Sequence, residues 1–206
     1  MKMWGRNTSS NVQKAMWAVG ELKLPCQRID VGGAYGRTKE PFYLAMNPNS
    51  LVPTLEEADG FTMWESNSIV RYLAAKHGGA LEPADPKVRA KAQQWMDWQL
   101  SVMGPAITPV FWGLIRTPPE KRDQAAIDAG KEKTTAAAKI LDAQLGKTRF
   151  VAGDAFSYGD IPVGVMTRRY VELVPERPAL PNLERWYGEL AKRPAFIEHC
   201  GGIPLT

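Results

Sequence analysis

Two short stretches of the chain place hydroxyl and carboxyl groups directly before helical patterns. The first is Thr8-Ser9-Ser10-Asn11, and the second is the pair Glu65-Ser66 in WESNS. A helix start has unpaired N–H groups and a partial positive charge, so it attracts anionic groups. Serine and asparagine also serve as ordinary helix caps. The pattern therefore predicts capped helices that can, at the same residues, bind a small ligand.

A proline inside an apolar run is the third unusual feature. Pro53 lies in LVPTLEE, which otherwise reads as a strand. Proline has no backbone N–H and is normally confined to strand starts, edges and bulges. Pro53 either begins an ordinary edge strand or shapes the backbone of the same ligand site.

The elements that position these residues alternate over roughly the first eighty positions. Apolar residues recur at helical spacing from Val12 to Val19, and Ile69, Val70 and Leu73 mark a second amphipathic helix. The Asp59-Gly60 pair predicts the turn of a hairpin. The predicted order is β-α-β-α-β-β-α, with strands in MKMWG, CQRIDV, VPTLEE and GFTMWE and a short helix in EPFYLAMN. Such an order predicts a mixed sheet covered by helices.

The remainder of the chain reads as helical. After a linker in ALEPADPKV, one apolar stripe runs from Val88 to Leu100 and is expected to break at Gly104-Pro105 and Pro109. Another stripe runs from Ile127 to Leu145, with Gly130 on its face for close packing. Pro181 starts a last helix. The predicted fold is a small α/β domain over residues 1–79 followed by an all-helical domain over residues 86–206.

The motif FSYGDI has the spacing of a helix capping box. Ser157 and Asp160 stand three residues apart, and Phe156 and Ile161 flank them as a hydrophobic staple. A catalytic Ser–Asp pair would need a histidine nearby, and none is present in the motif. The capping interpretation is therefore preferred.

Composition limits the classes of function. The chain has 206 residues, of which 44% are hydrophobic and 23% charged, with a net charge of +4. Two distant cysteines and two histidines predict a reducing compartment and no metal site. The basic residues are scattered among acids, which gives no support to nucleic-acid binding. The N-terminal stretch has no apolar core of a signal peptide and no run is long enough to cross a membrane, so we expect a cytoplasmic protein without membrane contact.

Taken together, four local patterns resemble the glutathione transferase family. TSSNVQKAMW resembles the first loop and helix of the serine-type, theta- and zeta-like classes, and NPNSLVPTLEE resembles the stretch that ends in Val-Pro before the third strand. WESNSIVRYLA resembles the acid-serine motif, and FSYGDI resembles the capping box of the helical domain. Each is weak alone, but their order and spacing extend the resemblance over the whole chain.

The resemblance implies a thioredoxin-like N-terminal domain, a helical C-terminal domain and a homodimer. It implies a cis peptide bond before Pro53, with the backbone of Val52 paired to the cysteinyl backbone of glutathione. Ser66 would hold the γ-glutamyl carboxylate, and Glu65 would accept from the ammonium group. Glutathione would be a co-substrate, and no metal would be needed.

The resemblance also places Ser9 at the position that activates the glutathione thiol. Ser10 and Asn11 are the neighbouring donors and glutathione-binding candidates. The loop holds no tyrosine and no cysteine, which argues against the tyrosine-type and cysteine-type classes. A free thiol has a pKa near roughly 8.5, so an enzyme gains by stabilising the thiolate at neutral pH.

One position departs from the family pattern. Leu51 occupies a glutathione-binding slot that often carries Gln, Lys or Arg in relatives, so Arg37 and Lys39 are candidates for the glycyl end. A hydrophobic second substrate would contact the helical domain, with Met103, Phe111 and Trp112 as the candidate lining. These three can equally be residues of the helical core.

The leading hypothesis is a transferase that adds glutathione thiolate to a hydrophobic electrophile. A glutathione-dependent disulfide reductase or peroxidase, or a maleylacetoacetate-type isomerase, would use the same thiolate. The alternative class is a binding or interaction module without catalysis, which the presence of all the site residues disfavours. A redox protein acting through its own thiols is excluded because the chain has no CxxC motif.

Overall fold

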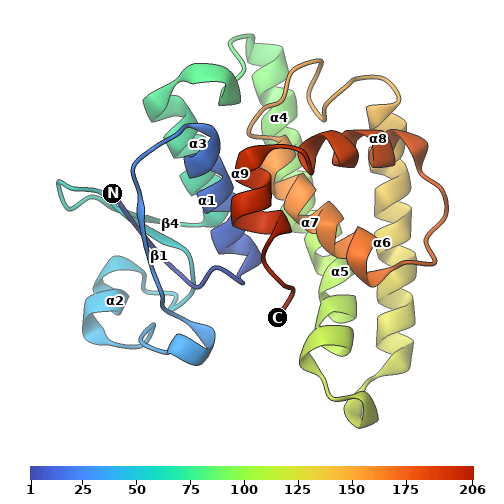
Figure 1. The fold of residues 1–206 in the computed structure, drawn as a ribbon, viewed down its shortest axis with the longest axis horizontal. Helices are drawn as coiled ribbons and strands as arrows, with labels where there is room; N and C mark the ends of the chain where they lie inside the picture. Colours follow the sequence, from blue (N-terminus) through green and yellow to red (C-terminus); the bar gives the residue numbers. More distant parts are fainter. The chain divides into compact units, whose positions relative to one another are not determined.

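The computed structural model of the chain describes residues 1–79 and 81–206, which form two compact units. The first unit comprises Met1–Glu82 and Pro194–Ile203, and the second comprises Pro83–Arg193 and Pro204–Thr206 (Figure 1). The first unit therefore includes a C-terminal segment that the sequence analysis assigned to the helical domain.

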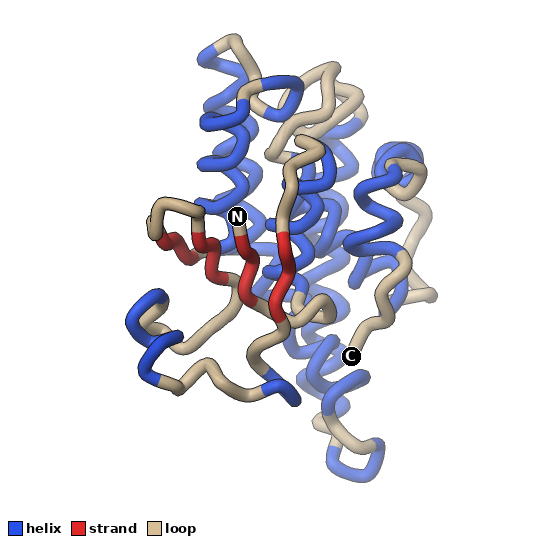
Figure 2. The backbone as a smooth tube through the Cα atoms, turned by 60° about the vertical axis from the view of Figure 1, so that its left-hand side comes forward, coloured by secondary structure: helices blue, strands red, loops and turns tan.

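The first unit is built on a four-stranded mixed sheet in the order β2-β1-β3-β4 (Figure 2). Its strands are short: β1 (Lys2–Trp4), β2 (Gln27–Ile29), β3 (Thr54–Glu56) and β4 (Thr62–Trp64). β1 is parallel to β2 and antiparallel to β3, and β4 is antiparallel to β3. Asp59 and Gly60 make the β3–β4 turn, with Gly60 at a φ of 89°. The Phe61 N–H donates to Asp59 Oδ1 at 3.0 Å. The predicted β-α-β-α-β-β-α order is confirmed.

Alternation along the strands sends side chains to opposite faces of the sheet. Met3 pairs with Leu55 across β1 and β3, and both pack fully buried with α1 (Ser10–Glu21) and α3 (Ser66–His77). Trp4 pairs with Thr54 and contacts the Phe42 ring of α2 (Pro41–Met46), with ring centroids 5.6 Å apart. Two helices thus cover one face, and α2 lies on the other.

The C-terminal segment packs on α1. It consists of α9 (Pro194–Phe196) and a π-helical turn over Ile197–Gly201. The Phe196 ring meets the Trp17 ring edge-on at a centroid distance of 4.9 Å. A Cβ at Gly20 would lie 2.8 Å from the Cβ of Ala195, so glycine permits this close approach. These contacts join positions that are far apart in sequence, so no local sequence pattern predicts them.

The second unit is all-helical, as predicted. Its helices are α4 (Pro86–Trp98), α5 (Gly104–Phe111), α6 (Gln124–Leu145), α7 (Asp160–Leu173) and α8 (Pro181–Leu190). A short 3₁₀ turn occupies Pro119–Lys121 in this unit, and two others, Gly33–Tyr35 and Gly79–Leu81, belong to the first unit. No described helix combines the length and apolar composition that a membrane-spanning segment needs.

The expected break at Gly104-Pro105 and Pro109 is wrong. Residues 86–116 stay helical, with π-helical turns at Gln99–Met103 and Trp112–Arg116 on either side of α5. A proline has no N–H to donate to the preceding turn of an α-helix. A π-helical turn accommodates one extra residue, so the chain stays helical on either side of the prolines. It also shifts the helical register, since Leu100, which we expected in the stripe, is 45% exposed while Gln99 is buried.

Close packing of α5 against α6 follows from Gly130, as predicted. A Cβ there would lie 2.8 Å from Val110 Cγ2 and 3.3 Å from the Ala106 carbonyl oxygen. Any larger residue would therefore push the two helices apart. The rest of the predicted α6 stripe is buried: Ile127, Thr134, Ala137, Leu141 and Leu145.

Asp160 ties the second unit together from a fully buried position. Its carboxylate accepts from the Ser157 N–H at 2.9 Å, the Val151 N–H at 3.0 Å and Trp186 Nε1 at 2.9 Å. The Ser157 hydroxyl accepts from the Gly159 N–H at 3.3 Å and donates to Asp160 Oδ2 at 3.3 Å. The bond from the Ser157 N–H to the Asp160 carboxylate is one half of the predicted capping box, whereas the Asp160 N–H donates to the Ser157 carbonyl at 3.0 Å and not to its hydroxyl. The Asp160 carboxylate also connects this turn to the Val151 loop and to Trp186 of α8. Burial raises the pKa of Asp160 to about 6 despite these donors.

Candidate functional site

Ser9 stands at the N-terminus of α1 with its hydroxyl unused by the helix. The Ser9 carbonyl accepts the Gln13 N–H at 2.9 Å, and the Ser9 N–H donates to the Arg6 carbonyl at 3.2 Å. Its backbone is extended, as an N-cap requires, yet its side chain makes no capping hydrogen bond. The side chain is only 9% exposed. The hydroxyl is therefore held at a positive helix end and is free to donate to a ligand.

Ser10 and Asn11 form the first turn of α1. Ser10 is half-buried and Asn11 is exposed. The Asn11 Oδ1 accepts a hydrogen bond from Lys14 Nζ at 3.1 Å. Lysine is a donor only, so this bond assigns the amide oxygen to Lys14 and leaves the Asn11 Nδ2 group facing elsewhere.

The backbone at Leu51 and Val52 is held from beneath by a polar network that the sequence analysis missed. Tyr43 Oη and Asn47 Nδ2 donate to the Leu51 carbonyl at 2.6 and 2.9 Å. Both side chains also bond to Thr54 Oγ1, at 2.9 and 3.1 Å. All three supporting residues are buried. The only sequence signal was their spacing: two polar groups four apart on the short helix before LVPT.

The Val52–Pro53 peptide bond is cis, as the resemblance implied. No described residue makes a hydrogen bond to the Val52 backbone N–H or carbonyl. The Leu51 side chain is 64% exposed. The main chain at Val52 thus presents a free donor and a free acceptor, the pair that another peptide backbone would match.

Glu65 and Ser66 shape the start of α3. Glu65 has a φ of 71°, a left-handed conformation that costs a non-glycine residue roughly 1–3 kcal/mol and is concentrated at functional sites. Its carbonyl accepts the Ile69 N–H at 2.9 Å, while its side chain caps nothing. Ser66 is 3% exposed and opens the helix. The N-terminal N–H groups of α3 and the Ser66 hydroxyl are suited to an anion.

A narrow cleft in the first unit collects most of these residues. Of the eight side chains predicted to activate or bind the ligand, six line it: Asn11, Leu51, Val52, Pro53, Glu65 and Ser66. Asn47, Asn49 and Trp64 complete the lining and were not predicted. Ser9 and Ser10 do not line it directly and lie in the two positions before Asn11. The cleft therefore joins the starts of α1 and α3 to the Leu51–Pro53 backbone.

The two basic residues considered for the glycyl end lie outside this lining. Arg37 forms an ion pair with Glu40 at 3.4 Å, and its guanidinium lies 4.8 Å from the centre of the Phe42 ring. Lys39 is exposed. Asn49, whose backbone N–H and side-chain amide both donate to Asn47 Oδ1, is a polar group within the lining near Leu51.

The candidates for the second substrate lie in the helical unit with different exposure. Met103 is fully buried, and Phe111 is 5% exposed beneath the Arg169 guanidinium, 3.8 Å from its ring centre. Trp112 begins the π-helical turn after α5 and is 58% exposed. Of the three, Trp112 presents apolar surface to solvent.

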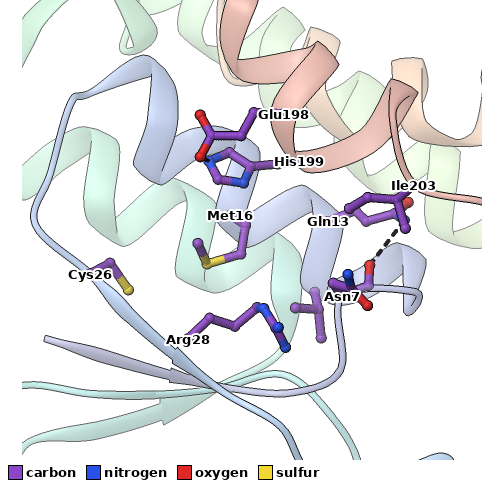
Figure 3. Close-up of a pocket in the computed structure, with 9 residues that line it drawn as sticks. Asn7, Gln13, Met16, Cys26, Arg28, Glu198, His199 and Ile203 are labelled. Carbon is purple, nitrogen blue, oxygen red and sulfur yellow. Dashed lines mark hydrogen bonds and ion pairs between the residues drawn. The ribbon is translucent and has the colours of Figure 1, made fainter.

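A separate cavity of about 320 Å³ lies between α1, β2 and the C-terminal segment (Figure 3). Figure 3 shows Met16, Cys26, Arg28 and His199 around it. Burial lowers the pKa of His199 and raises that of the Cys26 thiol, and Arg28 is paired with Asp30. Glu198 lines the cavity as well, with a largely exposed side chain. Across the described residues, no three His, Cys, Asp or Glu side chains gather as metal ligands would.

Comparison with known protein families matches both halves of the chain. Residues 8–76 match the model described as glutathione S-transferase, N-terminal domain, and residues 102–194 match glutathione S-transferase, C-terminal domain.

Individual relatives and solved structures extend over the whole chain. Glutathione S-transferase GstB of Escherichia coli is 43% identical over 206 residues, which cover 99% of each protein. Glutathione S-transferase F13 of Arabidopsis thaliana is 29% identical over 100% of this chain and 97% of its own. The theta-class glutathione S-transferase of Xanthomonas axonopodis pv. citri, solved with glutathione bound, superimposes with a TM-score of 0.95 at 41% identity, covering 100% of this chain and 98% of that one.

Proposed function

Because this chain belongs to the glutathione S-transferase family and is a glutathione transferase, we propose that Ser9 is the residue that activates the thiol. The observation that carries this proposal is the uncommitted Ser9 hydroxyl at the start of α1. A hydroxyl donor combined with a helix N-terminus lowers a thiol pKa by roughly one to two units. At neutral pH a much larger share of the bound sulfur is then thiolate than in free glutathione, ready to attack an electrophile.

Glutathione binds, in this proposal, as an extended peptide across the cleft. Its cysteinyl backbone pairs with the free N–H and carbonyl of Val52, where Pro53 and Leu51 flank the contact. Its γ-glutamyl carboxylate accepts from the Ser66 hydroxyl and the first N–H groups of α3. Its ammonium donates to the Glu65 carboxylate.

The second substrate is proposed to be a hydrophobic electrophile. Trp112 is the candidate with exposed aromatic surface, whereas Met103 and Phe111 are buried in the helical unit. An apolar lining with few fixed polar groups favours hydrophobic compounds over charged ones. The geometry of the site does not favour disulfide reduction, peroxide reduction or isomerisation by the thiolate over conjugation.

The chain is further proposed to act as a cytoplasmic homodimer. The helical unit carries an apolar groove over α5 and α6, lined among others by Val102, which is 39% exposed, and Ile140, which is 56% exposed. A contiguous apolar surface of this kind is typical of an interface between subunits. Both cysteines are free, which suits a reducing compartment.

Replacement of Ser9 by alanine tests the proposal kinetically. Turnover is expected to fall about 10–100-fold, while the dissociation constant of glutathione changes little, because the hydroxyl acts on the thiolate rather than on ground-state binding. Ser10→Ala, the same change one residue along, is the matched control and is expected to retain turnover. If Ser10→Ala or Asn11→Ala loses turnover and Ser9→Ala does not, the activating donor is at that position instead.

A further inference from the structure

Lys14 is a buried cation one helical turn from the cleft. It is 1% exposed, although lysine is almost never fully buried without partners. On α1 it lies three residues after Asn11, so the two side chains share a face of the helix. Its Nζ donates to Asn11 Oδ1 at 3.1 Å.

We propose that Lys14 is a positioning residue whose ammonium fixes the Asn11 amide so that the Nδ2 group donates to the glutathione sulfur. The inference rests on the proposed function, since it needs a thiolate in this cleft. Asn11 lines the cleft and is exposed there, and its Nδ2 has no bond to any described residue.

The chemistry of the two groups sets the direction of the amide. An asparagine side chain alone can present either its oxygen or its nitrogen to a ligand. Lys14 has three donors and no acceptor, so only the oxygen can face it. An oxygen turned toward the sulfur would repel the thiolate, whereas the amide N–H₂ stabilises it. The positive charge on Lys14 also polarises the amide and strengthens it as a donor.

Positioning of the Asn11 amide by Lys14 differs from a direct electrostatic effect of the Lys14 charge on the thiolate. A lysine that acted only through its charge would lower the thiol pKa whether or not Asn11 were present. A lysine that acts through the amide loses its effect once the amide is gone. A double-mutant cycle separates these two cases.

The experiment is an ultraviolet titration of the thiolate of bound glutathione in the full-length protein, in Lys14→Met, Asn11→Ala and the double variant. Lys14→Met is expected to raise the thiol pKa by about 0.5–1 unit, the size of one charge-assisted donor. Asn11→Ala is expected to match it, and the double variant to equal Asn11→Ala alone. An unchanged pKa in Lys14→Met overturns the inference, and so do shifts that add in the double variant.

A second variant covers the case in which Lys14→Met does not fold. Asn11→Asp keeps an acceptor for Lys14 but removes the Nδ2 donor, so its melting temperature should stay near that of the wild type. Its bound thiol pKa should rise at least as far as in Asn11→Ala, and an unchanged value overturns the inference. If the wild-type protein itself leaves the thiol pKa at its free value, the proposed function fails and this inference fails with it.

Discussion

At the scale of single residues, the site depends on groups whose hydrogen-bonding capacity the fold leaves unused. Ser9 caps α1 with its backbone and not with its hydroxyl, and Val52 exposes both main-chain groups. Glu65 is held in a left-handed conformation at the start of α3. Buried polar groups are normally satisfied within the protein. Free groups gathered around one cleft therefore indicate a ligand that completes them.

Ser66 is expected to contribute to binding rather than to chemistry. Ser66→Ala removes one hydrogen bond to a carboxylate, worth about 1.5–3 kcal/mol, so the dissociation constant of glutathione should rise at least roughly tenfold. The thiol pKa of the bound fraction should not change. Isothermal titration calorimetry measures the first effect. Ser68→Ala, two residues along the same helix and outside the cleft lining, is the matched control, and equal affinities in the two variants would remove the carboxylate role from Ser66.

The sequence predicted the site residues that stand out by their local context. Ser9, Glu65 and Ser66 precede apolar helical patterns, and Pro53 interrupts a strand, so each was visible as a local irregularity. Tyr43 was not, because its role depends on the Leu51 carbonyl returning to α2. A local sequence pattern does not show which backbone carbonyl accepts a hydrogen bond from a buried hydroxyl.

At the scale of elements, the Asp160 carboxylate joins the start of α7 to a loop and to α8. Local spacing predicted its bond to Ser157, while its bonds to Val151 and Trp186 come from tertiary packing. The same distinction applies to the helix through Gly104 and Pro109. Proline predicted breaks, and π-helical turns outside the proline segment kept the helix continuous.

Stability should depend on pH through Asp160 in a defined direction. Burial raises its pKa from 3.8 to about 6, so the folded state binds a proton more tightly than the unfolded state. The stabilising contribution is fully present below about pH 4 and is lost as the pH rises through about 6, to a total of about 3 kcal/mol. Relative to Asp160→Asn, which does not titrate, the free energy of unfolding of the wild type should therefore decline over this range.

Denaturant unfolding of both variants at several pH values measures this difference. Glu56 and Glu57, whose pKa values are lowered by bonds to Lys2 and Lys76, change stability in the opposite direction, but they are present in both variants and cancel. A difference between the variants that is constant or grows with pH would show that Asp160 stays ionised in the folded protein.

At the scale of the whole molecule, the chain is two units whose cores form from different patterns. Period-two strands and amphipathic helices predicted the first, and helical stripes predicted the second. The return of residues 194–203 to the first unit was not predicted, because Phe196 and Trp17 lie almost the full length of the chain apart. That return also forms the cavity beside β2, which no local motif indicated.

Thiol activation by Ser9 is tested most directly by the thiolate absorbance of bound glutathione, followed across pH in the wild-type protein and in Ser9→Ala. The wild type is expected to hold the bound thiol roughly one to two units below its free pKa, and Ser9→Ala is expected to return it most of the way. A wild-type value equal to that of free glutathione, or a lowered value that survives in Ser9→Ala, would contradict thiol activation by Ser9.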